Sequence, residues 1–262
     1  MASDLSSLVG GFEVTRLEDM KQIAFNERID IKYFFSLKLL PWLISEIESE
    51  YKILQVEGFV VQPYKTVYYD TPSLKLYLDH HNGKLNRYKL RKRLYIANNI
   101  SFAEIKFKSN KGITFKKRVS TDKNLDILTE EDRIFFGKNT NLTASELFPQ
   151  ATNYFNRITL VSKSEKERIT MDFNLRLERL GLESNLGNLV IAEVKKPRNE
   201  SITLIETKLN ELGIKSSSFS KYCTAIAMIE ENTKNNNFKI KVREYKKVND
   251  ESHSFDTFGQ FT

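Results

Sequence analysis

The chain has 262 residues, 40% of them hydrophobic, and its 41 Lys and Arg residues exceed its 34 Asp and Glu residues, which gives a net charge of +7. Its one cysteine, Cys223, excludes an intramolecular disulfide and indicates a reducing compartment, so we expect a cytoplasmic protein. Residues 1–11 lack the pattern of a signal peptide, and no apolar run is long enough to predict a membrane span.

The first predicted strand covers residues 28–34, where Arg28, Asp30 and Lys32 alternate with apolar side chains. An amphipathic helix is predicted over residues 36–51, with Pro41 bending or restarting it. A further strand is predicted at residues 66–69.

Three basic strands follow, at residues 87–95, 102–108 and 113–119, and residues 110–112 make the last two a hairpin. On one phase of these strands lie Arg87, Lys89, Arg91, Arg93, Glu104, Lys106, Lys108, Lys116 and Arg118. From Lys84 to Arg118 there are twelve Lys or Arg residues and one carboxylate, Glu104. The positive charge is therefore local, and it predicts an anionic partner.

In the second half, a capping box at Thr129 predicts a short helix that ends near Gly137. Strands are predicted at residues 155–161, 168–175 and 189–195. Two helices follow, residues 201–212 closed by Gly213, and a last helix capped by Ser220 that runs to residue 229. We expect one domain over residues 1–232 and a weakly structured polar tail over residues 233–262.

Several familiar chemistries are excluded by their missing motifs. The sequence has no Walker A loop, no dinucleotide fingerprint and no kinase catalytic loop. Its histidines, His80, His81 and His253, are expected in loop or tail segments, which argues against a histidine-centred triad. No nucleic-acid recognition module is visible either, so we expect no nucleic-acid partner.

The recurring cations have two interpretations. The polar phase of a half-buried strand usually faces solvent, but like charges on neighbouring strands repel one another, and a plain solvent face normally mixes both signs. The other phase is mostly apolar and needs cover, which the amphipathic helices can provide. These features favour an α+β fold, a mostly antiparallel closed β-barrel with covering helices, in which the cations line the lumen and bind a polyanion.

Six short motifs, in order, resemble the catalytic domain of vacuolar transporter chaperone proteins, which are polyphosphate polymerases of the triphosphate tunnel metalloenzyme type. The resemblance spans residues 25–230. The motifs are Arg91-x-Arg93-x-Tyr95, Glu104-x-Lys106, Phe115-Lys-x-Arg118, Tyr154-Phe-Asn-Arg157, Ala192-Glu-Val-Lys195 and Ser218-Phe-Ser-Lys-Tyr222.

The resemblance implies a triphosphate tunnel whose main phosphate ligands are Lys32, Arg91, Arg93, Lys106, Lys116, Arg157 and Lys221. Secondary phosphate contacts are implied for Lys89, Arg118, Arg168, Lys195 and Ser220. Glu193 is the implied ligand of a divalent metal, Mn²⁺ or Mg²⁺. The plainer alternatives are a salt bridge between Glu193 and a lysine, and a solvated first-turn position for Lys221.

Two departures from the family pattern bear on activity. Hydrolytic tunnel enzymes begin with Glu-x-Glu-x-Lys, whereas this chain has Arg28-Ile-Asp30-Ile-Lys32, which favours the polymerase branch. The polymerase pattern has a lysine where this chain has Ser218, which removes one expected phosphate contact and weakens the expectation of turnover.

The reaction implied is transfer of the terminal phosphoryl group of ATP to a growing polyphosphate chain, and it needs positioning and charge neutralisation more than a protein nucleophile. Hydrolysis of triphosphate or short polyphosphate stays an alternative, as does a non-catalytic module that binds polyphosphate or inositol phosphate. The expected partners are ATP and polyphosphate. Because no sensing domain or membrane helix is recognised, regulation or membrane coupling is expected to need a separate membrane-protein partner.

Overall fold

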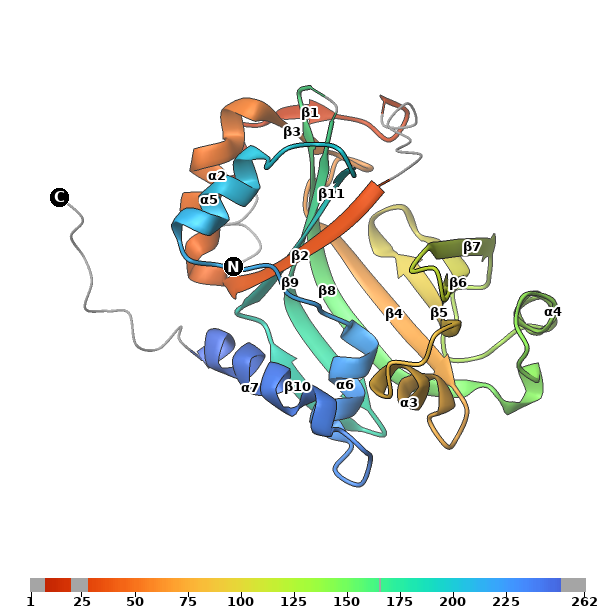
Figure 1. Ribbon diagram of the computed structural model, residues 1–262. Helices are drawn as coiled ribbons and strands as arrows, with labels where there is room; N and C mark the ends of the chain where they lie inside the picture. Colours follow the sequence, from red (N-terminus) through yellow and green to blue (C-terminus); the bar gives the residue numbers. More distant parts are fainter. Residues whose placement is uncertain (1–7, 20–27, 165, 251–262) are drawn as a thin grey trace.

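A computed structural model of the protein describes residues 8–19, 28–164 and 166–250 (Figure 1). Its centre is one large curled sheet. The strands are β1 (Glu13–Thr15), β2 (Arg28–Ser36), β3 (Tyr51–Leu54), β4 (Gln62–Asp70), β5 (Arg87–Tyr95), β6 (Ile100–Lys108), β7 (Thr114–Ser120), β8 (Phe148–Ser162), β9 (Arg168–Arg179), β10 (Leu182–Leu186) and β11 (Leu189–Pro197). The helices are α2 (Leu40–Ile47), α3 (Lys75–His81), α4 (Glu130–Asn139), α5 (Leu204–Glu211), α6 (Lys221–Ile229) and α7 (Asn236–Asp250).

The main path of the sheet runs in the order β2-β11-β9-β8-β4-β5-β6-β7, and every neighbour along it is antiparallel. The short β1 pairs parallel with β3, which joins the sheet at β8, and β10 pairs with β9. The predicted α+β fold with a mostly antiparallel, barrel-like sheet is confirmed.

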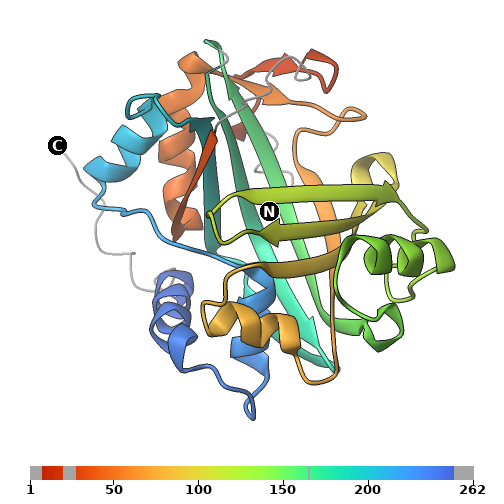
Figure 2. The ribbon, with the colours of Figure 1, turned by 45° about the vertical axis from the view of Figure 1, so that its right-hand side comes forward.

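The sheet is a curled half-barrel, and in this it differs from the closed barrel expected from the sequence. Among the described strands, β2 and β7 are the two ends of the path, with no pairing between them. Figure 2 shows the β6–β7 hairpin brought round in front of β8 and β9.

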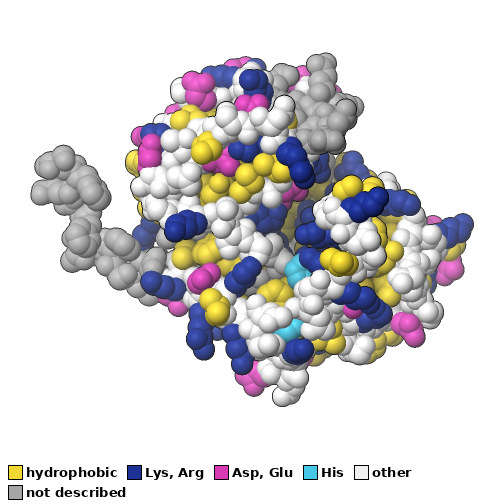
Figure 3. Space-filling model, in the orientation of Figure 1, with side chains coloured by type: hydrophobic (Ala, Val, Ile, Leu, Met, Phe, Trp, Pro, Cys, Tyr) yellow, Lys and Arg dark blue, Asp and Glu magenta, His cyan; other side chains and the backbone are white. Residues whose placement is uncertain are grey.

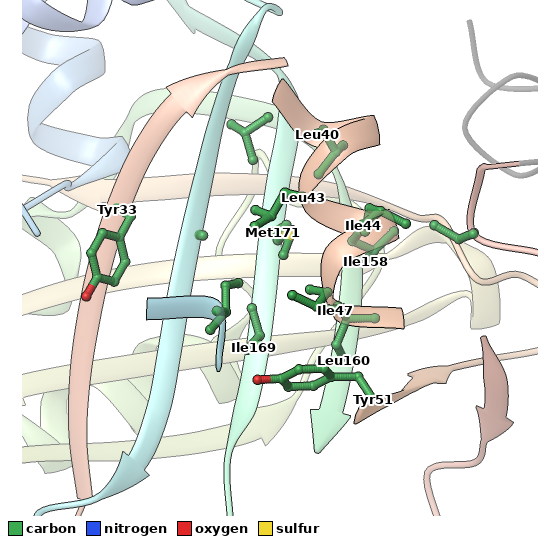
Figure 4. Close-up of a cluster of buried hydrophobic side chains, with 14 of the residues drawn as sticks. Tyr33, Leu40, Leu43, Ile44, Ile47, Tyr51, Ile158, Leu160, Ile169 and Met171 are labelled. Carbon is green, nitrogen blue, oxygen red and sulfur yellow. The ribbon is translucent and has the colours of Figure 1, made fainter. Parts of the chain in front are cut away.

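The convex face carries the largest apolar core. Helices α2 and α5 lie side by side on β2, β8, β9 and β11, and their buried side chains meet the apolar phase of those strands (Figure 4). Leu40, Leu43, Ile44 and Ile47 of α2 are all fully or almost fully buried there. Because this phase faces the helices, the charged phase of the same strands must face the concave side.

A second part of the convex face is covered by α4, which packs over β4, β5 and β6. Here Lys92, fully buried on the apolar phase of β5, forms an ion pair of 2.9 Å with Asp132 of the α4 capping box. The predicted capping box at Thr129 is confirmed.

Helices α6 and α7 fill one end of the concave face. Tyr222, Ala225 and Ile226 of α6 pack against the inward-facing Tyr68 and Leu177, and α7 packs on α6 from outside. The concave face is thus closed by helices at one end and leaves its cationic phase open along the rest of the sheet.

Three sequence predictions about local structure are wrong. Residues 236–250 of the expected weak tail form α7, because Phe238, Tyr245 and Val248 make a narrow apolar stripe that packs onto the core; residues 251–262 lie outside the described residues. His80 and His81, expected in a loop, lie on α3, whose first free N–H groups at Leu76 and Tyr77 donate to Asp70.

The third concerns the predicted helix over residues 36–51. It is split into α2 and flanking 3₁₀ turns, and its last predicted residue begins β3. Pro41 is the second residue of α2, so the restart expected there is confirmed and the bend is not, because a proline in the first turn removes no helical hydrogen bond. No helix in the described ranges combines the length and apolar character that crossing a membrane requires.

Candidate functional site

The strand register puts the predicted site residues on the concave face. Glu193 lies opposite Lys32 and Thr170, Asp172 opposite Arg157, and Thr66 opposite Arg93. Across the remaining strands, Glu104 lies opposite Arg91 and Arg118, and Lys106 opposite Lys89 and Lys116. In Figure 3, Lys and Arg side chains gather along the hollow between the part with α2 and α5 and the part with the β6–β7 hairpin.

The first ion cluster joins β2 and β11. The carboxylate of Glu193 accepts hydrogen bonds from the ammonium groups of Lys32 and Lys195, and Lys195 also lies 3.5 Å from Asp30. Burial raises the pKa of Glu193, but Lys195 and Lys32 outweigh it and hold that pKa well below its ordinary value. The salt bridge considered from the sequence is therefore present, with Lys32 and Lys195 as the partners.

The second ion cluster joins β8, β9 and α6. Arg157 donates two hydrogen bonds to Asp172, of 2.5 and 2.8 Å, and Lys221 donates to the same carboxylate. The side chain of Asp172 is only 4% exposed. Burial raises its pKa, yet the charges of Arg157 and Lys221 lower it below the ordinary value, so the carboxylate is ionised. Lys221 is held inside the concave face by this pairing and is not a solvated first-turn lysine.

The third ion cluster lies on β5, β6 and β7. Glu104, 1% exposed, accepts a 2.6 Å hydrogen bond from Arg91 and also pairs with Lys116. Burial raises the pKa of Glu104, and Arg91, Arg93 and Lys116 lower it further than burial raises it. Desolvation among the neighbouring side chains lowers the pKa of Lys116 to about 8, against the opposing charge of Glu104, although 43% of the lysine side chain is exposed.

An aromatic pair separates the second and third clusters. The rings of Tyr64 and Phe155 stack with centroids 5.1 Å apart, and the guanidinium groups of Arg93 and Arg157 lie 5.3 to 5.6 Å from both centroids. Lys221 lies 4.4 Å from the centroid of Phe155. These contacts fix the direction of the cations without neutralising them, because an aromatic face carries no net charge.

The three clusters are close enough to influence one another. The pKa of the exposed Lys106 on β6 is lowered to about 8, first by desolvation and then by the charges of Lys32, Lys89 and Arg91, while Glu193 opposes the change. Lys32 and Glu193 belong to the other end of the sheet, so the curl brings β6 within electrostatic reach of β2 and β11. All seven predicted main ligands thus belong to one network.

The predicted secondary ligands divide into inner and outer positions. Lys89 donates a 2.9 Å hydrogen bond to Ser220, the residue that caps α6, and Lys195 belongs to the first cluster. The Nε atom of Arg168 is buried without a hydrogen-bond partner, and burial together with Arg28 and Arg157 lowers its pKa. Arg118 lies at the exposed edge strand, with its guanidinium 4.5 Å from the centroid of Phe102.

Two residues of this network were missed from the sequence. Asp172 joins Arg157 to Lys221, and the period-two alternation from Arg168 through Thr170 already put it on the cationic phase. Tyr68 lies among Arg91, Arg93 and Lys221, which lower its pKa although burial raises it. An isolated tyrosine in a strand carries no signal for that position.

The described residues contain no group of three or more His, Cys, Asp or Glu side chains that could hold a metal by themselves. Mg²⁺ in phosphate-transfer sites is commonly bound by one or two carboxylates together with substrate oxygens. Glu193, 19% exposed and beside Asp30 and Lys195, fits that type of site, in which the phosphates supply the remaining ligands.

The sequence model of the family described as VTC domain matches residues 27–230. Comparison with curated protein sequences gives no match. Among solved structures, a proposed adenylate cyclase from Bacillus halodurans is similar at a TM-score of 0.48 and 16% identity, covering 74% of this chain and 94% of that one. One from Vibrio parahaemolyticus gives 0.45 and 14%, covering 75% and 96%. One from Hippeastrum, described as having a dominant triphosphatase activity, gives 0.44 and 14%, covering 78% and 98%.

Proposed function

The chain belongs to the VTC domain family, and we propose that it is a polyphosphate polymerase that transfers the terminal phosphoryl group of ATP to a growing polyphosphate chain. One observation supports this most strongly. Within the described ranges, the concave face carries Lys32, Arg91, Arg93, Lys106, Lys116, Arg157 and Lys221 together with the carboxylates of Asp30, Glu104, Asp172 and Glu193. Such an excess of cations in a partly enclosed space favours a ligand with several negative charges.

The chemistry of phosphoryl transfer matches these residues. The reaction demands in-line positioning and neutralisation of charge on the phosphate oxygens, which arginine forks and lysine ammonium groups supply. Arg91, Arg93 and Arg157 are held by hydrogen bonds or aromatic contacts, so their orientation is set before the ligand arrives. No protein nucleophile is required.

The lowered pKa values of the site carboxylates favour an anionic phosphate, and not water, as the acceptor of the phosphoryl group. Glu104, Asp172 and Glu193 all have pKa values below the ordinary range, because the charges of at least two neighbouring cations outweigh the opposing effect of burial on each carboxylate. A carboxylate with a lowered pKa is a weak general base, so none of the three suits the activation of water. A terminal phosphate of polyphosphate is already ionised and needs no such base.

A divalent metal, Mn²⁺ or Mg²⁺, is part of the proposal, with Glu193 as its protein ligand. When bound, the metal would neutralise charge on phosphate oxygens. The chain itself provides Lys32 and Lys195, which now pair with Glu193 and can turn to phosphate oxygens when the carboxylate binds a cation. The cytoplasmic location and the membrane-protein partner stay predictions.

The experiment that tests the proposal incubates purified protein with ATP and Mn²⁺ and separates the products on a gel. A ladder of polyphosphate that lengthens with time supports the polymerase. Release of free phosphate without a ladder would show that the protein is a hydrolase and not a polymerase. Binding of polyphosphate without ATP consumption would show that it is a non-catalytic binding module. Arg91→Ala serves as the inactive control, because Arg91 belongs to the central network.

A further inference from the structure

A second group of cations lies where β5 begins and β6 ends, next to α3, α6 and α7. We name it the outer cation cluster: Arg87, Lys89, Lys108 and Lys241, around the imidazole of His80. It differs from the three central ion clusters in one respect. Among the described residues, none of these four cations has a carboxylate within salt-bridge distance, whereas each central ion cluster is built around one.

The contacts in the outer cation cluster are with neutral groups. Arg87 lies opposite Lys108 in the β5–β6 register, so two like charges face each other across the strands. Lys89 donates to the hydroxyl of Ser220 at 2.9 Å, and Lys241 donates to the hydroxyl of Ser218. The Nδ1 atom of His80 is buried without a hydrogen-bond partner.

Lys241 is held there by the docking of α7. Phe238, Tyr245 and Val248 of this helix pack onto the core, and Lys241 falls on the same face because it lies three residues after Phe238 and four before Tyr245. The ring of Phe238 stacks near His80, with centroids 6.0 Å apart. The hydroxyl of Tyr245 donates to the carbonyl of Ser218 at 2.7 Å. The family match ends at residue 230, so Lys241 comes from a segment outside it.

This arrangement is costly without an anion. Four positive charges repel one another, and no carboxylate of the described chain offsets them. Burial and the charges of Lys89, Arg87, Lys108 and Lys241 lower the pKa of His80 to about 3, so its imidazole is neutral at physiological pH. A neutral imidazole can donate an N–H to an anion or accept from a cation, and no described residue forms a hydrogen bond with its Nδ1.

The outer cation cluster continues the central site along one strand. Arg87, Lys89, Arg91 and Arg93 share one face of β5 at every second residue, and the distance from Arg87 to Arg93 is about 20 Å along an extended strand. A triphosphate bound to the central cations Arg91 and Arg93 is too short to reach Arg87, whereas a longer polyphosphate chain can reach it.

We infer that His80, Arg87, Lys89, Lys108 and Lys241 form a second subsite, which binds phosphate groups of a polyphosphate chain beyond those held by the central ion clusters. This inference deepens the proposed function and rests on it. Lys241 takes its place in the subsite only because α7 docks, so the helix that follows the matched family region helps to select long chains over short ones.

The test compares binding of two probes, inorganic tripolyphosphate and a length-fractionated long polyphosphate, by titration calorimetry at one ionic strength. The full chain is expected to bind the long chain more tightly. Lys241→Ala should weaken long-chain binding by about tenfold, the lower end for a charge-assisted contact, and leave tripolyphosphate binding within about twofold. Lys246→Ala removes an exposed lysine from the same helix and should leave both affinities unchanged.

A second variant shows whether Lys241→Ala weakens binding by removing the charge or by disturbing the fold. Lys241 contacts Ser218, so a lysine at position 218 can deliver its ammonium group to the same place from the loop before α6. The Ser218→Lys, Lys241→Ala double variant should recover the long-chain affinity. If Lys241→Ala binds long polyphosphate as Lys246→Ala does, the subsite is wrong while the central site stands. If the unaltered protein binds neither probe, both the subsite and the proposed function are wrong.

Discussion

Glu193 on β11 lies directly opposite Lys32 on β2, and its carboxylate is shared between that lysine and Lys195. An acid among so many cations serves either as the partner of two lysines or, with phosphate present, as a metal ligand. The structure has the first arrangement. The second requires the lysines to exchange the carboxylate for phosphate oxygens, and it is open to a direct test.

Glu193→Gln preserves the shape of the side chain and removes its charge. If Glu193 holds the metal, metal-dependent ATP consumption should fall by at least about tenfold, the lower limit for disturbing a metal site. Polyphosphate should bind at least as tightly as before, because one repulsive charge is gone. Measuring ATP consumption and polyphosphate binding in parallel, with exposed Glu183→Gln as the control, distinguishes the roles. Unchanged ATP turnover would leave Glu193 only a salt-bridge partner.

Polyphosphate binding should weaken at alkaline pH. The pKa values of Lys106 and Lys116 are each lowered to about 8, chiefly by desolvation on the concave face, so both side chains lose positive charge between pH 7 and pH 9, although solvent reaches them both. Since a polyanion binds the protonated form, affinity should fall as pH rises through 8, by roughly tenfold between pH 7 and pH 9. A Lys106→Arg, Lys116→Arg variant should flatten this profile, because arginine stays charged. A parent profile that is already flat would contradict the prediction.

Asp172 should be a major contributor to stability in the free protein. Asp172→Asn leaves Arg157 and Lys221 buried without their shared carboxylate, which should lower the free energy of unfolding by about 3–5 kcal/mol. Because the pKa of Asp172 lies below its unfolded value, this stabilisation is present at neutral pH and disappears only in strong acid.

Polyphosphate should restore the stability that Asp172→Asn loses, since phosphate oxygens can replace the missing carboxylate between Arg157 and Lys221. Thermal melts with and without polyphosphate should therefore show a larger upward shift for Asp172→Asn than for the parent. Asp126→Asn, which breaks an exposed pair with Lys65, should change stability by less than about 1 kcal/mol and leave the ligand shift as in the parent. Equal ligand shifts in all three proteins would show that polyphosphate does not reach Arg157.

Arg93 should contribute directly to affinity. Its Nε donates to Thr66 at 2.9 Å, and its guanidinium faces Tyr64 and Phe155 but forms no ion pair with a carboxylate among the described residues. Arg93→Ala should cost about 1.5–3 kcal/mol in polyphosphate binding, the range for charge-assisted hydrogen bonds. Arg133→Ala, on the convex helix α4, is the matched control.

The affinity of the parent should also fall steeply with added salt, by analogy with counterion release from nucleic acids. Arg93→Ala should show a shallower salt dependence, because one charged contact is missing. An affinity that ignores ionic strength would argue against electrostatic binding on the concave face.

Much of the central site could be predicted from the sequence, because a strand alternates its side chains with a period of exactly two. That alternation assigned Lys32, Arg91, Lys106 and Glu193 to one face before any strand was paired. Composition indicated an anionic ligand, and motif order indicated the family.

Only the tertiary structure decides which charged residues form ion pairs with one another. Period two assigns a residue to a face but does not identify its neighbour, since the pairing of β9 with β8 and the docking of α6 decide that Asp172 receives both Arg157 and Lys221. The sequence likewise does not determine whether the sheet closes into a barrel, because pairing between β2 and β7 depends on the curl of the whole sheet.

Helix α7 is the clearest example of an element that could not be predicted from the sequence. Only Phe238, Tyr245 and Val248 of its apolar residues pack onto the core, in a polar sequence that resembles a tail, and a helix with so narrow a stripe gains stability mainly from the surface it covers. That surface is assembled from α6 and the concave face, which come from distant parts of the chain. Only after they fold does Lys241 acquire a defined place among the cations.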